Sequence, residues 1–182
     1  MSLFVVSGLS GAGKSTILKW LKDNDKLEPN SIIMDQDAYF YARQRKPMPM
    51  FTLSNGSQTT NYDSPDAIDN KQLEKDVNQY LSQGKNVYIS GFMFRKNMYN
   101  LKPLIHFHLL ICKDTSTYRR QNSKGYKDFN QQKKDKMRMD ELIYPEYLKT
   151  LSNSKIHYFL DGTKPININA EYIRKKIHKK LK

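Results

Sequence analysis

A glycine-rich segment near the N-terminus has the residue types of a phosphate-binding loop. Residues 8–16 read Gly-Leu-Ser-Gly-Ala-Gly-Lys-Ser-Thr, which satisfies the pattern G-x-x-x-x-G-K-[ST] in full. In such a loop the glycines let successive backbone N–H groups face one oxyanion at the positive end of a helix. The lysine reaches the β- and γ-phosphate oxygens of a nucleoside triphosphate, and the hydroxyl after it binds Mg²⁺. We therefore expect the nucleotide to be bound by Gly8, Ser10, Gly11, Ala12, Gly13, Lys14, Ser15 and Thr16.

Acidic and aromatic residues follow the next apolar run of the sequence. Asp35 and Asp37 come directly after 32–34, and Tyr39 and Phe40 follow them. Phosphoryl transfer to a hydroxyl needs a carboxylate that accepts or orients the hydroxyl proton. The aromatic side chains offer a flat wall for a ring of the acceptor. The alternative interpretation is an acidic turn with aromatic residues that anchor it to the core.

A third acidic residue, Asp63, stands immediately before the helix-start signal Ser64-Pro65-Asp66. Two hydroxyls of a sugar are a natural bidentate partner for a carboxylate in this position. The alternative is that Asp63 and Asp66 only favour the helix N-terminus electrostatically.

Histidines and the single cysteine give weaker signals. His106 and His108 alternate on one predicted strand, so both lie on one face. A metal pair or two polar strand residues would fit this spacing, and the second fits better because no third ligand is evident. Cys112 is the sole cysteine, which excludes an intrachain disulfide and fits a reducing, cytoplasmic compartment. We expect Cys112 to be a buried strand residue.

The elements that position these residues alternate along the chain. Apolar runs predict strands at 2–7, 31–34, 86–90, 105–112 and 156–160. Helices are predicted at 14–23, from Ser64-Pro65 to Gly84, at 115–122, at 131–151 with a break near Pro145, and at 168–181. Residues 42–61 read as a long irregular excursion. This order predicts an α/β fold in which helices cover both faces of a mostly parallel sheet of about five strands. Ligands of such sheets bind at the carboxyl ends of the strands.

Composition limits the classes of protein that the sequence can represent. The 182 residues form a single expected domain, 1–182, and their apolar runs are too short to span a membrane. No signal-peptide pattern is present. Lys and Arg outnumber Asp and Glu by 31 to 18, a net charge of +13 that attracts polyanions. The basic segment 174–182 is interpreted as an amphipathic helix with a solvated face, with a nucleic-acid tail as the alternative.

The motifs together resemble the uridine kinase and nicotinamide riboside kinase group of P-loop kinases. After the glycine-rich loop come QDAYF, NYDSPDAID, YISGF, YRRQNSKGY and YFLDGTK, in the order seen in that group and over nearly the whole chain. The small size and the YPEYLK and YFLDGTK stretches are most similar to nicotinamide riboside kinase. The resemblance implies a P-loop NTPase fold with a short lid. It also implies transfer of the ATP γ-phosphoryl, with Mg²⁺, to the 5′-hydroxyl of a ribonucleoside, either nicotinamide riboside or a pyrimidine nucleoside such as uridine or cytidine.

The resemblance also implies roles for single residues. Asp37 would be the base that positions the 5′-hydroxyl, and Asp63 would bind the ribose hydroxyls. The acceptor pocket would be lined by Tyr39, Phe40 and Tyr62. The lid would carry Arg119 and Arg120, which clamp phosphate oxygens, with Lys124 where the group has a further arginine. The adenine would be bordered by the loop that contains Gly162 and Lys164.

One position departs from the pattern of this group. The third strand usually ends in Glu-Gly, and that carboxylate supports the Mg²⁺ site, but this chain has Ser90-Gly91. Asp35 is the nearest acidic residue that could compensate, so we assign it to the metal together with Ser15. Two alternatives remain open at this point: a kinase that acts on nucleic-acid 5′ ends or another small hydroxyl acceptor, and a nucleotide-binding protein with weak catalysis.

Overall fold

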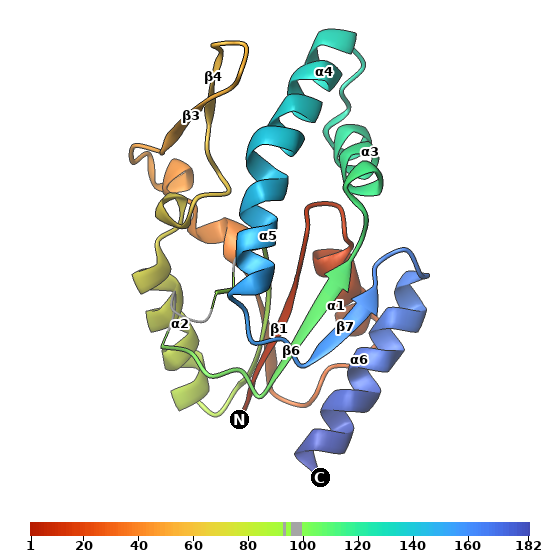
Figure 1. Cartoon of the computed structure of the whole chain (residues 1–182). Helices are drawn as coiled ribbons and strands as arrows, with labels where there is room; N and C mark the ends of the chain where they lie inside the picture. The colour runs from red at the N-terminus through yellow and green to blue at the C-terminus, as the bar shows by residue number, and fades with distance from the viewer. Residues whose placement is uncertain (93, 96–99) are drawn as a thin grey trace.

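The computed structural model describes residues 1–92, 94–95 and 100–182. Its centre is a parallel five-stranded sheet with the strand order β2-β5-β1-β6-β7. The strands are β1 (Leu3–Gly8), β2 (Ser31–Asp35), β5 (Asn86–Gly91), β6 (Ile105–Leu110) and β7 (Tyr158–Asp161). All five therefore end at the same edge of the sheet, while both chain termini lie toward the opposite end (Figure 1). This architecture confirms the predicted α/β fold.

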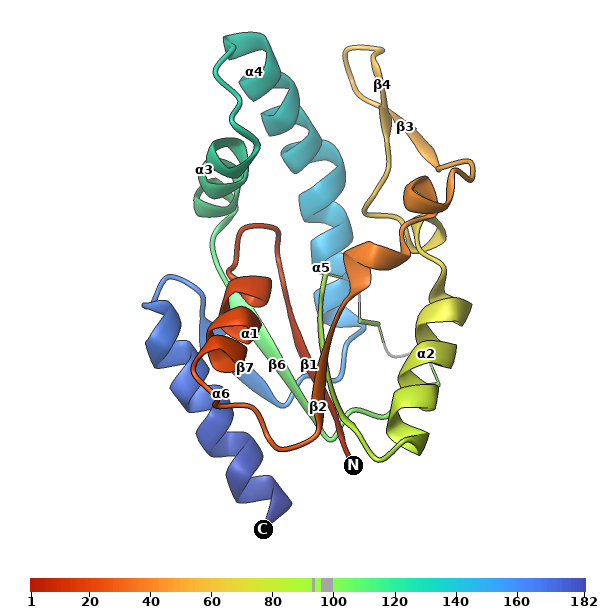
Figure 2. The ribbon, with the colours of Figure 1, turned by 180° about the vertical axis from the view of Figure 1, so that it is seen from behind.

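Helices cover both faces of the sheet. Helices α1 (Lys14–Asp23) and α6 (Ile166–Leu181) lie on one face, and α2 (Asn70–Ser82) and α5 (Tyr144–Ser152) lie on the other (Figures 1 and 2). Because side chains alternate along a strand, β1 supplies residues to two core clusters. Phe4 and Val6 of β1 belong to the cluster that includes α1 and α6, and Leu3 and Val5 pack with residues of α2.

An arm of three helical segments stands above the carboxyl edge of the sheet (Figure 1). It consists of α3 (Lys113–Lys124), α4 (Phe129–Arg138) and a π-helical turn (Met139–Ile143) that leads directly into α5. The helix break predicted near Pro145 corresponds to this π-helical turn, and the helical path continues through it into α5. Pro145 lies in the first turn of α5, where a missing N–H is tolerated.

The segment expected to be irregular contains a β-hairpin. Strands β3 (Met50–Thr52) and β4 (Gln58–Thr60) pair antiparallel beside a short 3₁₀ turn, Tyr41–Gln44. The next helix also begins later than expected. Ser64 caps only a 3₁₀ turn, Pro65–Ala67, and α2 starts at Asn70, where the Asp69 carboxylate accepts a hydrogen bond from Gln72 N–H.

The structure also bears on the expectations for Cys112 and for the basic C-terminal segment. The prediction that Cys112 is buried is wrong: β6 ends at Leu110, and Cys112 is exposed at the N-terminus of α3. Helix α6 is amphipathic, because Ile173 and Ile177, two of its apolar residues spaced four apart, are buried. Leu181, at the end of the chain, is 41 % exposed. In the part of the chain that the structure describes, no helix combines the length and apolar character that crossing a membrane requires.

Candidate active site

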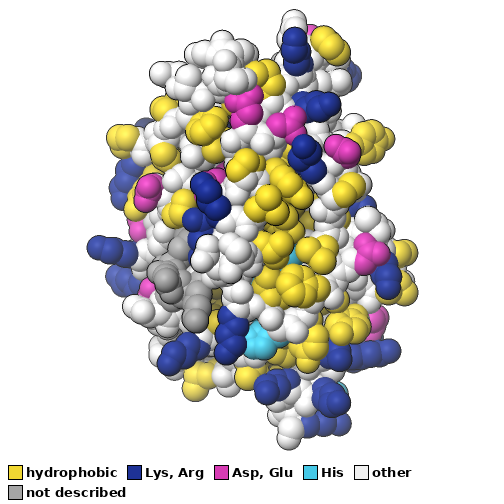
Figure 3. Space-filling view, in the orientation of Figure 1, with side chains coloured by type: hydrophobic (Ala, Val, Ile, Leu, Met, Phe, Trp, Pro, Cys, Tyr) yellow, Lys and Arg dark blue, Asp and Glu magenta, His cyan; other side chains and the backbone are white. Residues whose placement is uncertain are grey.

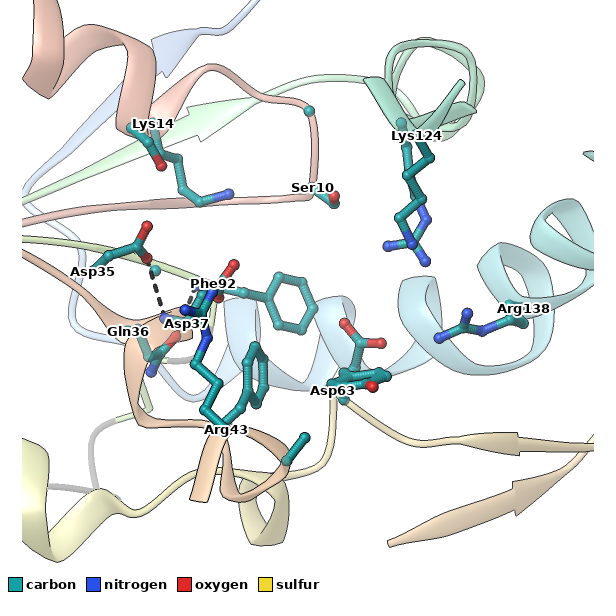
Figure 4. Close-up of a pocket in the computed structure, with 17 residues that line it drawn as sticks. Ser10, Lys14, Asp35, Gln36, Asp37, Arg43, Asp63, Phe92, Lys124 and Arg138 are labelled. Carbon is teal, nitrogen blue, oxygen red and sulfur yellow. Dashed lines mark hydrogen bonds between the residues drawn. The ribbon is translucent and has the colours of Figure 1, made fainter. Parts of the chain in front are cut away.

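A cavity of about 590 Å³ opens at the carboxyl edge of the sheet (Figure 4). Its walls come from the ends of β1, β2 and β5, from the turns after β2, from the segment after β4 and from the helical arm. Its lining residues are Ser10, Gly11, Lys14, Ser15, Asp35, Gln36, Asp37, Phe40, Ala42, Arg43, Tyr62, Asp63, Gly91, Phe92, Arg120, Lys124 and Arg138. Segments far apart in the sequence thus converge at the edge where a parallel sheet binds ligands.

The glycine-rich loop joins β1 to α1 and forms one side of the cavity. Gly13 precedes α1 with a φ of +91°, a left-handed conformation that L side chains rarely adopt. Lys14 Nζ lies 3.1 Å from the carbonyl oxygen of Leu9, to which it donates. Burial lowers the pKa of Lys14, and the carboxylates of Asp37, Asp35 and Asp63 oppose that shift. The lysine therefore faces three carboxylates across the cavity.

The turn after β2 holds two of these carboxylates in place. Asp35 caps the turn, because its Oδ1 accepts from the N–H of Asp37 at 3.1 Å. Between them, Gln36 is fully buried, and its Oε1 accepts from the N–H of Phe92 at 2.9 Å. Gly91 allows this contact, since a Cβ there would lie 2.5 Å from Gln36 Oε1. Loss of water around the Asp37 carboxyl raises its pKa, Asp35 adds to the rise, and Lys14 and Arg43 oppose it.

Oxygen donors for a divalent cation are available beside the lysine. Ser15, Asp35 and Asp37 all line the cavity and offer the hydroxyl and carboxylate oxygens that Mg²⁺ prefers. Within the described residues, no group of three or more His, Cys, Asp and Glu side chains could hold a metal alone. This donor set fits Mg²⁺, which is usually bound through one or two carboxylates together with substrate phosphates.

Asp63 occupies the other end of the cavity (Figure 4). Among the described residues, none donates a hydrogen bond to its carboxylate or forms an ion pair with it, so both oxygens are available to a ligand. Burial raises its pKa, while Arg120 and Arg138 act in the opposite direction. Tyr62, its neighbour, meets Phe40 edge to face with ring centroids 5.4 Å apart. These two rings form an aromatic wall beside the carboxylate.

The two expected lid arginines have different environments. Arg120 lines the cavity and forms a buried ion pair with Asp135, with Nε 2.9 Å from Oδ1. Arg119 does not line this cavity: its Nη1 donates to the carbonyl oxygens of Gly11 at 3.2 Å and Gly162 at 2.9 Å. Arg119 thus joins the phosphate loop to the loop after β7 that was expected to border the adenine.

Some expected residues lie elsewhere, and others were missed. The hydroxyl of Tyr39 donates to Asp76 Oδ2 at 2.8 Å, and Tyr39 is not part of the cavity wall. Arg43, Phe92 and Arg138 line the cavity although no role was derived for them from the sequence. Phe92 could have been found, because it follows the end of a predicted strand. Arg138 gave no signal, since only the path of the helical arm brings it opposite Asp63 (Figure 4).

Comparisons with known proteins bear on the fold of the chain. No family model matches the chain. A uridine kinase of Lactobacillus helveticus (strain DPC 4571) is 36 % identical over 76 residues, which are 42 % of this chain and 33 % of the relative, so the match spans one third of that protein's length. Among solved structures, a candidate fructose transport system kinase from Silicibacter sp. TM1040 superimposes with a TM-score of 0.56. That match has 11 % identity and covers 87 % of this chain and 89 % of the other. The architecture of this chain is therefore the α/β fold of P-loop kinases.

Proposed function

We propose that this protein is a kinase that transfers the γ-phosphoryl group of ATP to the 5′-hydroxyl of a ribonucleoside. The observation that carries the proposal is the placement of Lys14 and two carboxylates, Asp37 and Asp63, in one cavity behind a phosphate loop. An ATPase needs a positioned water, whereas a carboxylate with free oxygens next to an aromatic wall suits an acceptor that carries a diol and a ring.

Each side chain has a defined task in this proposal. Asp37 accepts or orients the proton of the attacking hydroxyl, and its raised pKa makes it a better proton acceptor than an ordinary carboxylate. Lys14 and Arg120 offset negative charge on the phosphoryl group during transfer. Asp63 accepts hydrogen bonds from the ribose hydroxyls. Bound Mg²⁺, held by Ser15 and Asp35, would neutralise charge on the phosphate oxygens.

The sequence match supports a nucleoside as the acceptor, because the matched relative is named a uridine kinase. The structural neighbour is named for fructose transport, and its low identity speaks for the fold alone. Nicotinamide riboside and the pyrimidine nucleosides uridine and cytidine are the acceptors we propose to test first.

A substrate panel tests the proposal directly. The purified protein is incubated with ATP and Mg²⁺ and with uridine, cytidine, nicotinamide riboside, fructose or a short oligonucleotide that has a 5′-hydroxyl, and products are identified by mass spectrometry. We expect a 5′-monophosphate from at least one nucleoside and none from the Lys14→Met variant. Phosphorylation of fructose or of the oligonucleotide alone would contradict the proposal, as would tight ATP binding without transfer to any acceptor.

A further inference from the structure

A chain of four polar side chains is buried beneath helix α5. Ser7 of β1, His106 and His108 of β6 and Tyr147 of α5 are each no more than 3 % exposed. Ser7 Oγ lies 2.6 Å from His106 Nε2 and 2.7 Å from His108 Nδ1. The hydroxyl of Tyr147 lies 3.1 Å from His108 Nε2. Four polar groups in a core are costly unless every one of them is hydrogen-bonded.

The donor and the acceptor of every hydrogen bond among these four side chains can be assigned, starting from His106. His106 Nδ1 faces the carbonyl oxygen of Lys155 at 3.1 Å, so this nitrogen carries the proton. In a neutral imidazole the other nitrogen is then an acceptor, and Ser7 donates its hydroxyl proton to it. Ser7 Oγ in turn accepts from Nδ1–H of His108, and His108 Nε2 accepts from the hydroxyl of Tyr147. A single assignment of protons satisfies the whole chain.

Both histidines are neutral in this arrangement. Burial lowers the pKa of His106 and of His108 to about 4. An added proton on either ring would take away the acceptor of the Ser7 or Tyr147 hydroxyl and would bury a charge.

The chain connects the two sides of the candidate active site. Ser7 directly precedes Gly8, where the phosphate loop begins. At the other end, the ring of Tyr147 stacks on His108 at 5.6 Å and on Phe92 at 6.2 Å between centroids. Phe92 lines the cavity, and its N–H is held by Gln36, the residue between Asp35 and Asp37. One continuous set of contacts therefore runs from the phosphate loop to the carboxylates.

We propose that Ser7, His106, His108 and Tyr147 are positioning residues that fix the wall carrying Phe92 and the two carboxylates relative to the phosphate loop. None of the four lines the cavity. Apolar side chains of similar volume would fill the same space without the need to satisfy four polar groups, but they would not impose a directed geometry. The inference rests on the proposed kinase activity, and its kinetic test separates the two.

The first test needs no activity. In ¹⁵N NMR spectra of the imidazoles of the whole protein at pH 7, His106 and His108 are expected to be neutral and protonated on Nδ1. His157 is a useful contrast, because its Nδ1 accepts from the N–H of His106 at 3.0 Å and its proton is therefore expected on Nε2. A charged ring, or a proton on Nε2 of His106 or His108, would overturn the proposed chain.

The second test removes one hydroxyl with the variant Tyr147→Phe, which keeps the aromatic ring. We expect phosphoryl transfer to the acceptor to fall by about 10- to 100-fold in kcat, since small displacements of reacting groups have effects of this size. The KM for ATP and the slow hydrolysis of ATP without acceptor should stay within about twofold, because the phosphate loop is intact. The matched control is Tyr158→Phe, whose ring stacks on Phe107 outside the chain and which should keep wild-type kcat.

The outcomes separate this inference from the proposed function. If wild-type protein phosphorylates no acceptor, the proposed function fails and the positioning role fails with it. If wild-type protein is active and Tyr147→Phe matches it in kcat, the positioning role alone is overturned. A parallel fall in transfer and in acceptor-free ATP hydrolysis would also overturn it, because that result indicates general loss of structure.

A third test measures the thermal unfolding of Ser7→Ala, a variant that leaves His106 and His108 each short of a hydrogen-bond partner. Its Tm should be lower than that of wild type, and an unchanged Tm would contradict the proposed hydrogen bonds.

Discussion

Asp35 and Ser90 are neighbours across two parallel strands. β2 and β5 pair with Asp35 opposite Ser90, so the Asp35 carboxylate lies one strand away from the position at which the kinase group that the sequence resembles is expected to have an acid. Ser90 is buried, whereas Asp35 is exposed in the cavity beside Ser15. This placement supports the proposal that Asp35 supplies the missing carboxylate.

Removal of the Asp35 charge should therefore weaken the response to metal. With Asp35→Asn, we expect the Mg²⁺ concentration that gives half-maximal activity to rise by about tenfold, because a neutral amide is a poorer partner for a hard cation. The side-chain oxygen that caps Asp37 N–H is retained in this variant. A titration of initial rate against Mg²⁺ measures the effect, with Asp66→Asn as the control on a neighbouring turn. Identical titration curves for wild type and Asp35→Asn would remove Asp35 from the metal site.

The Asp37 carboxylate should matter for transfer and little for nucleotide binding. We expect Asp37→Asn to lower kcat by about 10²- to 10⁴-fold, the usual contribution of a positioned proton acceptor. The Kd for ATP should change by less than about threefold, because the phosphate loop does not contain Asp37. Rates from coupled assays and Kd values from calorimetry check both parts. A kcat near that of wild type would exclude Asp37 as the proton acceptor.

At the scale of elements, the sequence predicted what depends on local pattern. The five strands and the helix after the phosphate loop follow from apolar runs and glycine placement, and all are present. The hairpin β3–β4 was missed because its strands have three residues each, too few to show alternation. The cavity residues Arg43 and Arg138 could not be found, because their place depends on how distant segments pack.

Hydrogen bonds join the hairpin to the helical arm, and Asp63 follows the hairpin in the sequence. Ser54 donates to both carboxylate oxygens of Glu141, from its N–H at 2.7 Å and from its hydroxyl at 2.6 Å. Arg138 Nη2 also lies 3.4 Å from the Thr60 carbonyl oxygen, at the end of β4. Since Asp63 follows β4 by three residues, a loose hairpin would leave that carboxylate less well placed.

Loss of the Ser54–Glu141 contact should loosen the hairpin and weaken acceptor binding. For Glu141→Ala we expect about 1 kcal/mol less local stability, a common contribution of exposed charge-assisted bonds, and so roughly fivefold faster amide exchange in residues 50–60. The KM for the acceptor should rise while the Kd for ATP stays the same. Hydrogen exchange measured by mass spectrometry tests this, with Glu171→Ala on α6 as the control. Unchanged exchange in the hairpin would show that the contact contributes nothing to its docking.

At the scale of the whole molecule, basic side chains line the cavity and also lie far from it. Lys and Arg side chains are scattered over the face shown in Figure 3, while hydrophobic side chains gather over its middle, in the region of α5, β6 and β7 in Figure 1. The basic end of α6 lies at the end of the molecule away from the carboxyl edge of the sheet (Figure 1). The basic C-terminal residues and the cavity therefore lie toward opposite ends of the molecule.

Acid should destabilise the whole fold through the two buried histidines. Their pKa values are lowered from 6.5 to about 4 by burial; His157, Lys155 and Lys14 also lie near them. Because the unfolded chain binds protons more readily than the folded one between these values, stability is present in full above pH 6.5 and is lost as the pH falls toward 4. The loss is on the order of 3 kcal/mol per histidine. Urea unfolding at pH 7.5, 6, 5 and 4.5 measures it. The control variant His178→Gln, at an exposed position on α6, should show the same dependence of stability on pH as wild type. A wild-type free energy of unfolding that stays constant over this pH range would contradict the prediction, because it would show that the folded protein accommodates charged histidines.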